Sequence, residues 1–272
     1  MDSRPEDLIR IRGLLPMATQ AMDIAAEIIR DQVPSVIRAK GDRDMVSDID
    51  VQIERAVRGF MHERTPDIGF MGEEEGGSSG PELQWVLDPI DGTANFVKGI
   101  PLYAISLALV SGDEPVLGVI DVPADGSRYT AATDAGAYWG RERIRVRPTA
   151  ELGQATVTVG DYAVGDQAAA KNQARLAVTA ELARRALRVR MLGTAAIDLA
   201  WLAHGRTDAA IIAGGKPWDI AAGTVIVREA GGAVSDAAGS RHNFRASSMV
   251  ASSPKLLGQI LELLGDAHAS LP

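Results

Sequence analysis

The sequence contains no cysteine, and it has few histidines and few aromatic residues. Without cysteine the chain has no disulfide, no thiolate nucleophile and no Cys-ligated zinc or iron–sulfur site. The four histidines are not spaced as metal ligands, which argues against an imidazole-rich zinc site; they are His62, His204, His242 and His268. Any catalytic chemistry must therefore rely on carboxylates.

Basic residues and long apolar runs are also scarce. Lys and Arg number 28 against 36 Asp and Glu, which gives a formal net charge of −8. We expect no nucleic-acid partner, because neutralising phosphates needs a basic surface. The longest apolar run, Ile100 to Val110, is shorter than the ~20 residues that span a bilayer. The charged start MDSRPEDLIRIRG also lacks the apolar core of a signal peptide, so we expect a cytoplasmic protein with no membrane partner.

The hydrophobic pattern changes near the middle of the 272 residues. The first part predicts a helix over Leu14 to Ile28, a second helix that begins at Ser47 or Asp48, and short strands that end in an antiparallel meander over 102–133. From about residue 154, strands alternate with helices, which indicates an α/β arrangement. We predict one compact unit of two halves, residues 1–150 and 151–272, with a ligand cleft between them.

Three acidic segments depart from what folding alone requires, and the first is the GEEEG segment that begins at Gly72. It places three glutamates in succession at the end of a short apolar strand. Like charges in a row repel one another unless solvent or a cation compensates them. A metal-binding turn and a solvated acidic loop both remain open for this segment alone.

The second segment is WVLDPIDGTANF, in which an apolar strand leads directly into Asp88. Pro89 follows and restricts the backbone at that position, and Asp91 and Gly92 form a turn before Thr93. If Thr93 begins a short helix, the amides of Gly92 and Thr93 form a phosphate site, beside which Asp88 and Asp91 offer the hard oxygen ligands that suit Mg²⁺. The alternative is an ordinary Asx–proline turn at the end of a strand.

The third segment is GGKPWDIAAG, which places Asp219 in the first turn of a predicted helix rich in small residues. A carboxylate at a helix N-terminus is stabilising by itself. Asp219 is therefore either a metal ligand or a plain cap when this segment is considered alone.

In this order and at these separations, the GEEEG, WVLDPIDGTANF and PWDIAAG segments resemble the inositol monophosphatase family of Mg²⁺-dependent, lithium-sensitive phosphatases. The resemblance runs from Asp44 to Gly232, which is most of the chain. It implies an α+β fold, the layered αβαβα sandwich of inositol monophosphatases and fructose-1,6-bisphosphatases. It also implies a homodimer.

The resemblance further implies two or three bound Mg²⁺ ions. Glu73, Asp88 and the carbonyl of Ile90 would hold the first ion, and Asp88, Asp91 and Asp219 the second. Glu73 would also take part in a third, weaker site, and it counts among the catalytic residues. The implied enzyme is a Mg²⁺-dependent phosphoric monoester hydrolase.

The resemblance assigns the remaining motif residues to the substrate phosphate and the attacking water. The amides of Gly92 and Thr93 would bind the phosphate, while Thr93 and Asp50 would orient and deprotonate a metal-activated water. This chemistry needs no covalent phosphoenzyme, which agrees with the absence of cysteine and with the absence of histidine from these motifs.

The substrate is less clearly indicated than the reaction. We expect a small polyol or sugar phosphate, but the position where inositol-specific members carry a ring-binding glutamate is occupied here by Ile212, which cannot accept a hydroxyl hydrogen bond. Ile212 is then either a substrate neighbour or a core residue of its strand. Ala195, in a GTAA segment, borders the substrate in the family, and Asp161 lies where a serine contacts inositol.

Other substrates within the family remain open. Asp161 would favour an amine-bearing substrate such as histidinol phosphate, unless it is simply exposed to solvent. Fructose-1,6-bisphosphate is another candidate, and a 3′-phosphonucleotide would need basic residues, for which the candidates are Arg184, Arg185, Arg188 and Arg190. A family member that acts chiefly as a binding or regulatory protein is the alternative of another class, although every metal-binding carboxylate is present.

Overall fold

A computed structural model describes residues 5–30, 32, 36–41, 44–77, 82–243, 246 and 248–269. The helices are α1 (Pro5–Gly13), α2 (Leu15–Arg30), α3 (Asp48–Arg64), α4 (Thr93–Val97), α5 (Ala168–Arg185), α6 (Ala195–Ala203), α7 (Pro217–Glu229) and α8 (Leu257–Ala269). A short 3₁₀ helix spans Leu152–Gln154. None of the described helices is both long and apolar enough to cross a membrane.

The larger sheet has eight strands in the order β10-β9-β8-β7-β6-β5-β3-β4. Its members are β3 (Gly69–Gly72), β4 (Gly76–Gly77), β5 (Leu83–Asp91), β6 (Ala104–Ser111), β7 (Glu114–Val122), β8 (Ser127–Ala132), β9 (Gly136–Trp139) and β10 (Glu142–Ile144). Strands β6, β7 and β8 pair antiparallel in succession, so the predicted meander is confirmed. Only the β3–β5 pair of this sheet is parallel.

The smaller sheet has five strands in the order β12-β11-β13-β15-β14. They are β11 (Thr156–Val159), β12 (Arg188–Arg190), β13 (Ala209–Ala213), β14 (Ala233–Ser235) and β15 (Ser248–Ser252), and β11 runs parallel to both of its neighbours. A separate hairpin pairs β1 (Ile37–Gly41) with β2 (Asp44–Ser47). The division of the chain near residue 150 stays a prediction.

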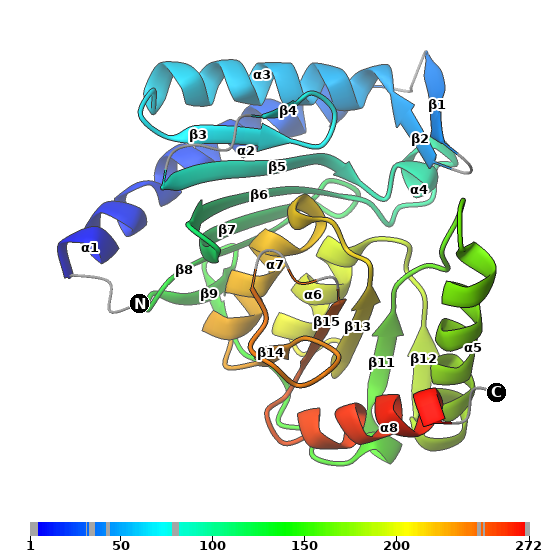
Figure 1. Cartoon of the computed structure of the whole chain (residues 1–272). Helices are drawn as coiled ribbons and strands as arrows, with labels where there is room; N and C mark the ends of the chain where they lie inside the picture. The colour runs from blue at the N-terminus through cyan, green and yellow to red at the C-terminus, as the bar shows by residue number, and fades with distance from the viewer. Residues whose placement is uncertain are drawn as a thin grey trace.

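The helices and the two sheets stack as five layers (Figure 1). Helices α2 and α3 cover one face of the larger sheet, α6 and α7 lie between the sheets, and α5 and α8 cover the outer face of the smaller sheet. Three buried apolar clusters fill the four interfaces, because one of them lies on both sides of α6 and α7. The chain is thus the expected αβαβα sandwich of the α+β class.

Local sequence signals explain where the helices of the first layer begin. Helix α3 starts after Ser47, whose side chain accepts from the amide of Asp50 while the Asp50 carboxylate accepts from the Ser47 amide. This reciprocal capping box stabilises the first turn. Helix α2 begins at Leu15 with Pro16 in its first turn, where a missing N–H costs nothing. Both predicted helices are confirmed.

Glycines allow α7 to approach its neighbours closely. A Cβ added to Gly118 of β7 would come within 2.5 Å of the Ala222 carbonyl oxygen, and one added to Gly223 would overlap the side chain of Leu199 in α6. Tight contact on both sides fixes the helix that carries Asp219 at its N-terminus.

Candidate active site

Parallel pairing brings the first two acidic segments together. In the β3–β5 register, Gly72 lies opposite Leu87, so the residues that follow, Glu73 after β3 and Asp88 within β5, lie side by side. The Glu73 amide donates to the Leu87 carbonyl at 3.2 Å, which continues the ladder by one step. The adjacency of these two carboxylates is therefore set by backbone pairing.

A bulge in β5 places Asp88 and Asp91 on the same side of the strand. Asp88 pairs with Ser106 and Asp91 with Ala104, so three steps along β5 match two along β6. Residues three apart in a regular strand face opposite ways, whereas one extra residue restores the same side. Pro89 lies inside the irregular stretch, where its missing N–H leaves no ladder bond unmade. The DPID order thereby supplies two carboxylates to one site.

The third acidic segment reaches the same place through the start of α7. Asp219 lies in the first turn, and its Oδ2 accepts from the Lys216 amide at 2.8 Å. The neighbouring carbonyl of Trp218 accepts from the Ser106 hydroxyl at 3.2 Å. Because Ser106 is the strand partner of Asp88, this bond joins the N-terminus of α7 to the bulged part of the sheet.

Electrostatics show that the carboxylates act on one another. Burial raises the pKa of Asp88 well above its usual range, and the charges of Glu73, Asp91 and Asp219 raise it further. Burial, opposed by the Thr194 hydrogen bond, raises the pKa of Asp91 to about 6. Burial and the charge of Asp91 raise that of Asp219 to about 8. The site thus favours the protonated forms of Asp88, Asp91 and Asp219, and Glu73 acts on all three.

No three His, Cys, Asp or Glu side chains among the described residues form a group that would hold a metal ion as they stand. The four carboxylates nevertheless influence one another, and repulsion keeps like charges apart until a cation neutralises them. Their oxygens are the donors that hard divalent cations prefer. The donor set therefore fits Mg²⁺.

The predicted water-orienting pair is also in contact. The Thr93 hydroxyl lies 3.3 Å from Asp50 Oδ1 and donates to the Ile90 carbonyl at 3.0 Å. The other Asp50 oxygen accepts from the amide and hydroxyl of Ser47. Burial raises the pKa of Asp50, and the Ser47 hydrogen bonds oppose that rise.

Helix α4 begins at Thr93, as the motif predicts. Its N-cap, Gly92, has φ of 92°, a left-handed conformation that favours glycine. The first amides of a helix have no acceptor within the helix, so those at the start of α4 are available to an anion. They lie directly after Asp91 in the chain, beside the carboxylates.

Two further residues support the site, and sequence reasoning missed their roles. Asp91 Oδ2 accepts from the Thr194 hydroxyl and from the Ala196 amide, both at 2.6 Å, at the N-terminus of α6. Asn95 donates to the carbonyls of Leu102 and Leu192, at 2.7 and 2.8 Å. The GTAA and DGTANF motifs contain these residues, but only the tertiary fold shows that they join segments far apart in the sequence.

Of the predicted substrate residues, Asp161 follows β11, Ile212 lies near the end of β13, and Ala195 begins α6. Ile212 is 5% exposed and belongs to the apolar cluster between the sheets, which fits a core residue of its strand. Asp161 is exposed, and its carbonyl accepts from Arg175, which also donates to the Ala213 carbonyl at 2.5 Å. Sequence reasoning missed Arg175, and the substrate contacts of Asp161, Ala195 and Ile212 stay predictions.

Two of the arginines considered for a second phosphate already have acidic partners. Arg184 pairs with Glu181, and Arg185 pairs with Asp266 of α8 at 3.1 Å. These ion pairs occupy both guanidinium groups on the surface of α5, and a phosphate-binding role for the four arginines stays a prediction.

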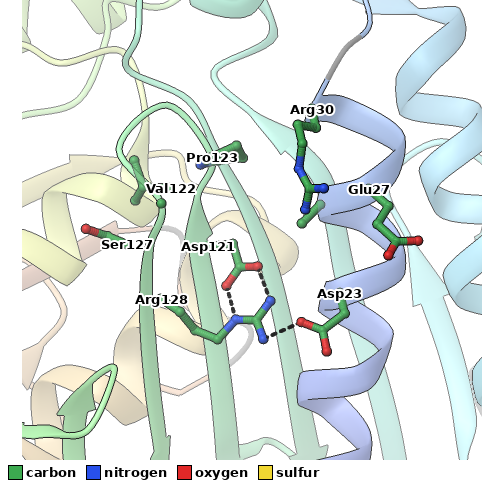
Figure 2. A pocket seen from close by; sticks show the side chains of 10 residues that line it. Asp23, Glu27, Arg30, Asp121, Val122, Pro123, Ser127 and Arg128 are labelled. Atoms are coloured by element: carbon green, nitrogen blue, oxygen red, sulfur yellow. Dashed lines mark hydrogen bonds and ion pairs between the residues drawn. The ribbon is translucent and has the colours of Figure 1, made fainter.

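A pocket of about 550 Å³ lies elsewhere, between α2 and the β7–β8 hairpin, and Figure 2 shows its charged lining. Arg128 forms two bonds of 2.6 Å to Asp121 and one of 2.7 Å to Asp23. Burial raises the pKa of Asp121 and Arg128 opposes the rise. None of the predicted site residues lines this pocket. Arg128 bridges Asp23 of α2 and Asp121 of β7 and so holds the helix against the sheet.

Comparisons with known proteins agree with the motifs. The chain is 38% identical over 260 residues to the probable inositol 1-monophosphatase ImpA of Mycobacterium tuberculosis, covering 94% of this chain and 95% of that one. It is 34% identical to the fructose-1,6-bisphosphatase/inositol-1-monophosphatase of Thermotoga maritima, with 86% and 88% covered. It is also 38% identical to the Nus factor SuhB of Xylella fastidiosa, with 72% and 70% covered.

Solved structures agree on the fold. The crystal structure of the extragenic suppressor protein suhB from Bartonella henselae matches with a TM-score of 0.86 and 31% identity, covering 93% of this chain and 98% of that one. The profile of the inositol monophosphatase family matches residues 11–269. The chain belongs to the inositol monophosphatase family.

Proposed function

We propose that this phosphatase of the inositol monophosphatase family is a Mg²⁺-dependent phosphomonoesterase for a small polyol or sugar phosphate. The observation that carries the proposal is the convergence of Glu73, Asp88, Asp91 and Asp219 from three separate segments. Folding alone gives no reason to gather four buried or half-buried acids, because burial and the repulsion between their charges raise the pKa values of Asp88, Asp91 and Asp219.

Divalent cations would convert this repulsion into binding. Glu73, Asp88 and the Ile90 carbonyl would hold one Mg²⁺; Asp88, Asp91 and Asp219 would hold a second; and Glu73 would contribute to a third. Bound Mg²⁺ lowers the pKa of its water ligand and neutralises phosphate charge. The hydrogen bonds from Thr194 and Ala196 fix one oxygen of Asp91, which orients the carboxylate before any ion binds.

The chain's own residues would orient the substrate and the water. The first amides of α4, at Gly92 and Thr93, would bind the phosphate oxygens. Asp50 would accept the proton of the attacking water, because its Oδ1 faces the Thr93 hydroxyl while Ser47 holds its Oδ2. The raised pKa of Asp50 favours this role, since a stronger base accepts a proton more readily.

Fructose-1,6-bisphosphate, histidinol phosphate and 3′-phosphonucleotides are the alternative substrates. The name of the Thermotoga maritima relative supports the first of them. The apolar Ile212 supports a substrate other than inositol, because it offers no acceptor to a ring hydroxyl.

A non-catalytic, regulatory member is the alternative of another class, and the name of the Xylella fastidiosa relative supports it. The presence of every proposed ligand and of the Asp50–Thr93 pair favours the enzyme. We further propose a cytoplasmic, lithium-sensitive homodimer that binds neither nucleic acid nor membranes.

The test is phosphate release from a panel of these four substrate types with Mg²⁺, with EDTA, and with Mg²⁺ plus high-millimolar Li⁺. We expect hydrolysis that requires Mg²⁺, that Li⁺ inhibits, and that Asp91→Asn reduces at least ~100-fold. The variant should stay folded, since asparagine keeps an oxygen for Thr194 and Ala196. No release across the panel, together with tight binding of a protein partner, would support the regulatory alternative.

A further inference from the structure

We infer that Glu54 of α3 is a positioning residue that fixes the turn carrying Glu73 and so sets the affinity of the proposed metal centre. This inference rests on the proposed function, because it concerns the same metal. Glu54 lies outside the three acidic motifs and is not one of the proposed metal ligands or substrate-binding residues.

The carboxylate of Glu54 is bonded to the backbone on the far side of Glu73. Its side chain is completely buried. Oε2 accepts from the Glu74 amide at 2.7 Å, and Oε1 accepts from the Glu75 amide at 3.0 Å. Two charge-assisted bonds to consecutive amides fix the backbone direction immediately after Glu73.

Arg58, one turn further along α3, also binds the turn that carries Glu73. Its Nη2 donates to Glu54 Oε1 at 2.6 Å and to the Gly76 carbonyl at 2.7 Å. Its guanidinium also lies over the ring of Phe70, 4.6 Å from the centroid, in the strand that enters the turn. The turn is therefore held on both sides of Glu73.

Gly72 shows how closely the carboxylate approaches. A Cβ at this position would overlap the Glu54 carboxyl group. Glycine therefore lets a buried acid lie directly under the turn. The Glu73 amide is held separately by the Leu87 carbonyl of β5, so the backbone on either side of this residue is bonded to a rigid element.

The same face of α3 carries the proposed base. Asp50, Glu54 and Arg58 follow one another at intervals of four residues, which places them in one row along the helix. Asp50 faces Thr93 at the start of the row, and Glu54 holds the Glu73 turn one helical turn later. Helix α3 thus fixes the distance between the water-orienting group and a metal ligand.

A purely structural role is the competing explanation, because a buried carboxylate and its arginine also stabilise the fold. The two explanations differ in what happens to the folded protein. If Glu54 only supports folding, its loss lowers the melting temperature but leaves the metal affinity of the folded fraction unchanged. If it positions Glu73, metal affinity falls even where folding is complete.

The experiment measures Mn²⁺ binding by electron paramagnetic resonance, with Mg²⁺ as competitor, and the Mg²⁺ dependence of phosphate release. Glu54→Gln keeps one acceptor oxygen but presents an NH₂ group to the other amide and to Arg58. We expect its Mn²⁺ affinity to fall ~10–100-fold, the Mg²⁺ concentration for half-maximal rate to rise by a similar factor, and kcat at saturating Mg²⁺ to change less than ~3-fold. Glu63→Gln, the same change at an exposed position of α3, should match the wild type.

If folded Glu54→Gln binds Mn²⁺ as the wild type does, the inference is wrong while the proposed function stands. If the wild type itself binds no Mn²⁺ and releases no phosphate, the proposed function has failed instead. Should Glu54→Gln not fold, Arg58→Gln decides, because Arg58 is partly exposed and its loss frees the Gly76 side of the turn. A fall of at least ~3-fold in Mn²⁺ affinity for folded Arg58→Gln supports the inference, and wild-type affinity overturns it.

Discussion

Removing divalent cations and raising the pH from 6.5 to 8.5 should destabilise the protein. Burial raises the pKa of Asp219 in the folded chain from 3.8 to about 8. A raised carboxylate pKa stabilises the folded state below the unfolded value, and this stabilisation is lost as the pH rises through the folded value. Between pH 6.5 and 8 the unfolded chain binds one proton fewer at Asp219, so the free energy of unfolding falls by ~1.4 kcal/mol per pH unit, ~2 kcal/mol in all.

The pH range begins at 6.5 because a histidine with a lowered pKa has the opposite effect on stability below that pH. Burial lowers the pKa of His242 from 6.5 to about 4, so this histidine makes stability rise with pH up to about 6.5 and contributes no slope above it. Asp91, whose folded pKa is about 6, has lost most of its contribution by the start of the window. The remaining slope therefore reports on Asp219 together with Asp88, whose pKa is also raised well above its usual range.

Urea denaturation in EDTA, repeated at half-unit pH steps, measures the effect. Mg²⁺ binds only the deprotonated acids, so saturating Mg²⁺ should remove the slope and stabilise the protein most at pH 8.5. Asp219→Asn in EDTA is the matched control and should lose the ~2 kcal/mol that Asp219 contributes across the window, while the contribution of Asp88 remains. A wild-type free energy of unfolding that stays level or rises across the window would refute the reasoning, as would an equal slope in Asp219→Asn.

Two further predictions concern packing. Arg128→Met leaves the buried Asp121 without its partner and should lower the free energy of unfolding, measured by urea denaturation, by ~3–5 kcal/mol. Adding Asp121→Asn to this variant should make the loss smaller. An equal or larger loss in the double variant would contradict the pairing. Gly223→Ala introduces a methyl group against Leu199 of α6 and should cost ~1–3 kcal/mol in the same assay, whereas unchanged stability would show that α7 can shift.

Signals within a few residues predicted the local structure well. Ser47 caps α3 as its position before the apolar repeat indicates, and the turn residues of the meander separate strands that the structure pairs in that order. The condition set for a phosphate site, a short helix that begins at Thr93, is met by α4. In each case the deciding interaction lies within a single turn or hairpin.

Features that depend on distant residues could not be derived from spacing. The β5 bulge is defined only by its register with β6, and the meeting of Glu73 with Asp88 depends on a parallel pairing between β3 and β5. Glu54 looks like any acid on an amphipathic helix until the fold places the Glu73 turn above it. The motifs named the acidic residues, and tertiary pairing accounts for their convergence.

The central claim is that Glu73, Asp88, Asp91 and Asp219 form a divalent-cation centre. Mn²⁺ binding to the wild type and to Asp91→Asn, followed by electron paramagnetic resonance with circular dichroism as the check on folding, tests it most directly. The account predicts saturable binding to the wild type that Mg²⁺ displaces, and an affinity at least ~100-fold weaker in the folded variant. Folded Asp91→Asn that binds Mn²⁺ as tightly as the wild type would contradict it.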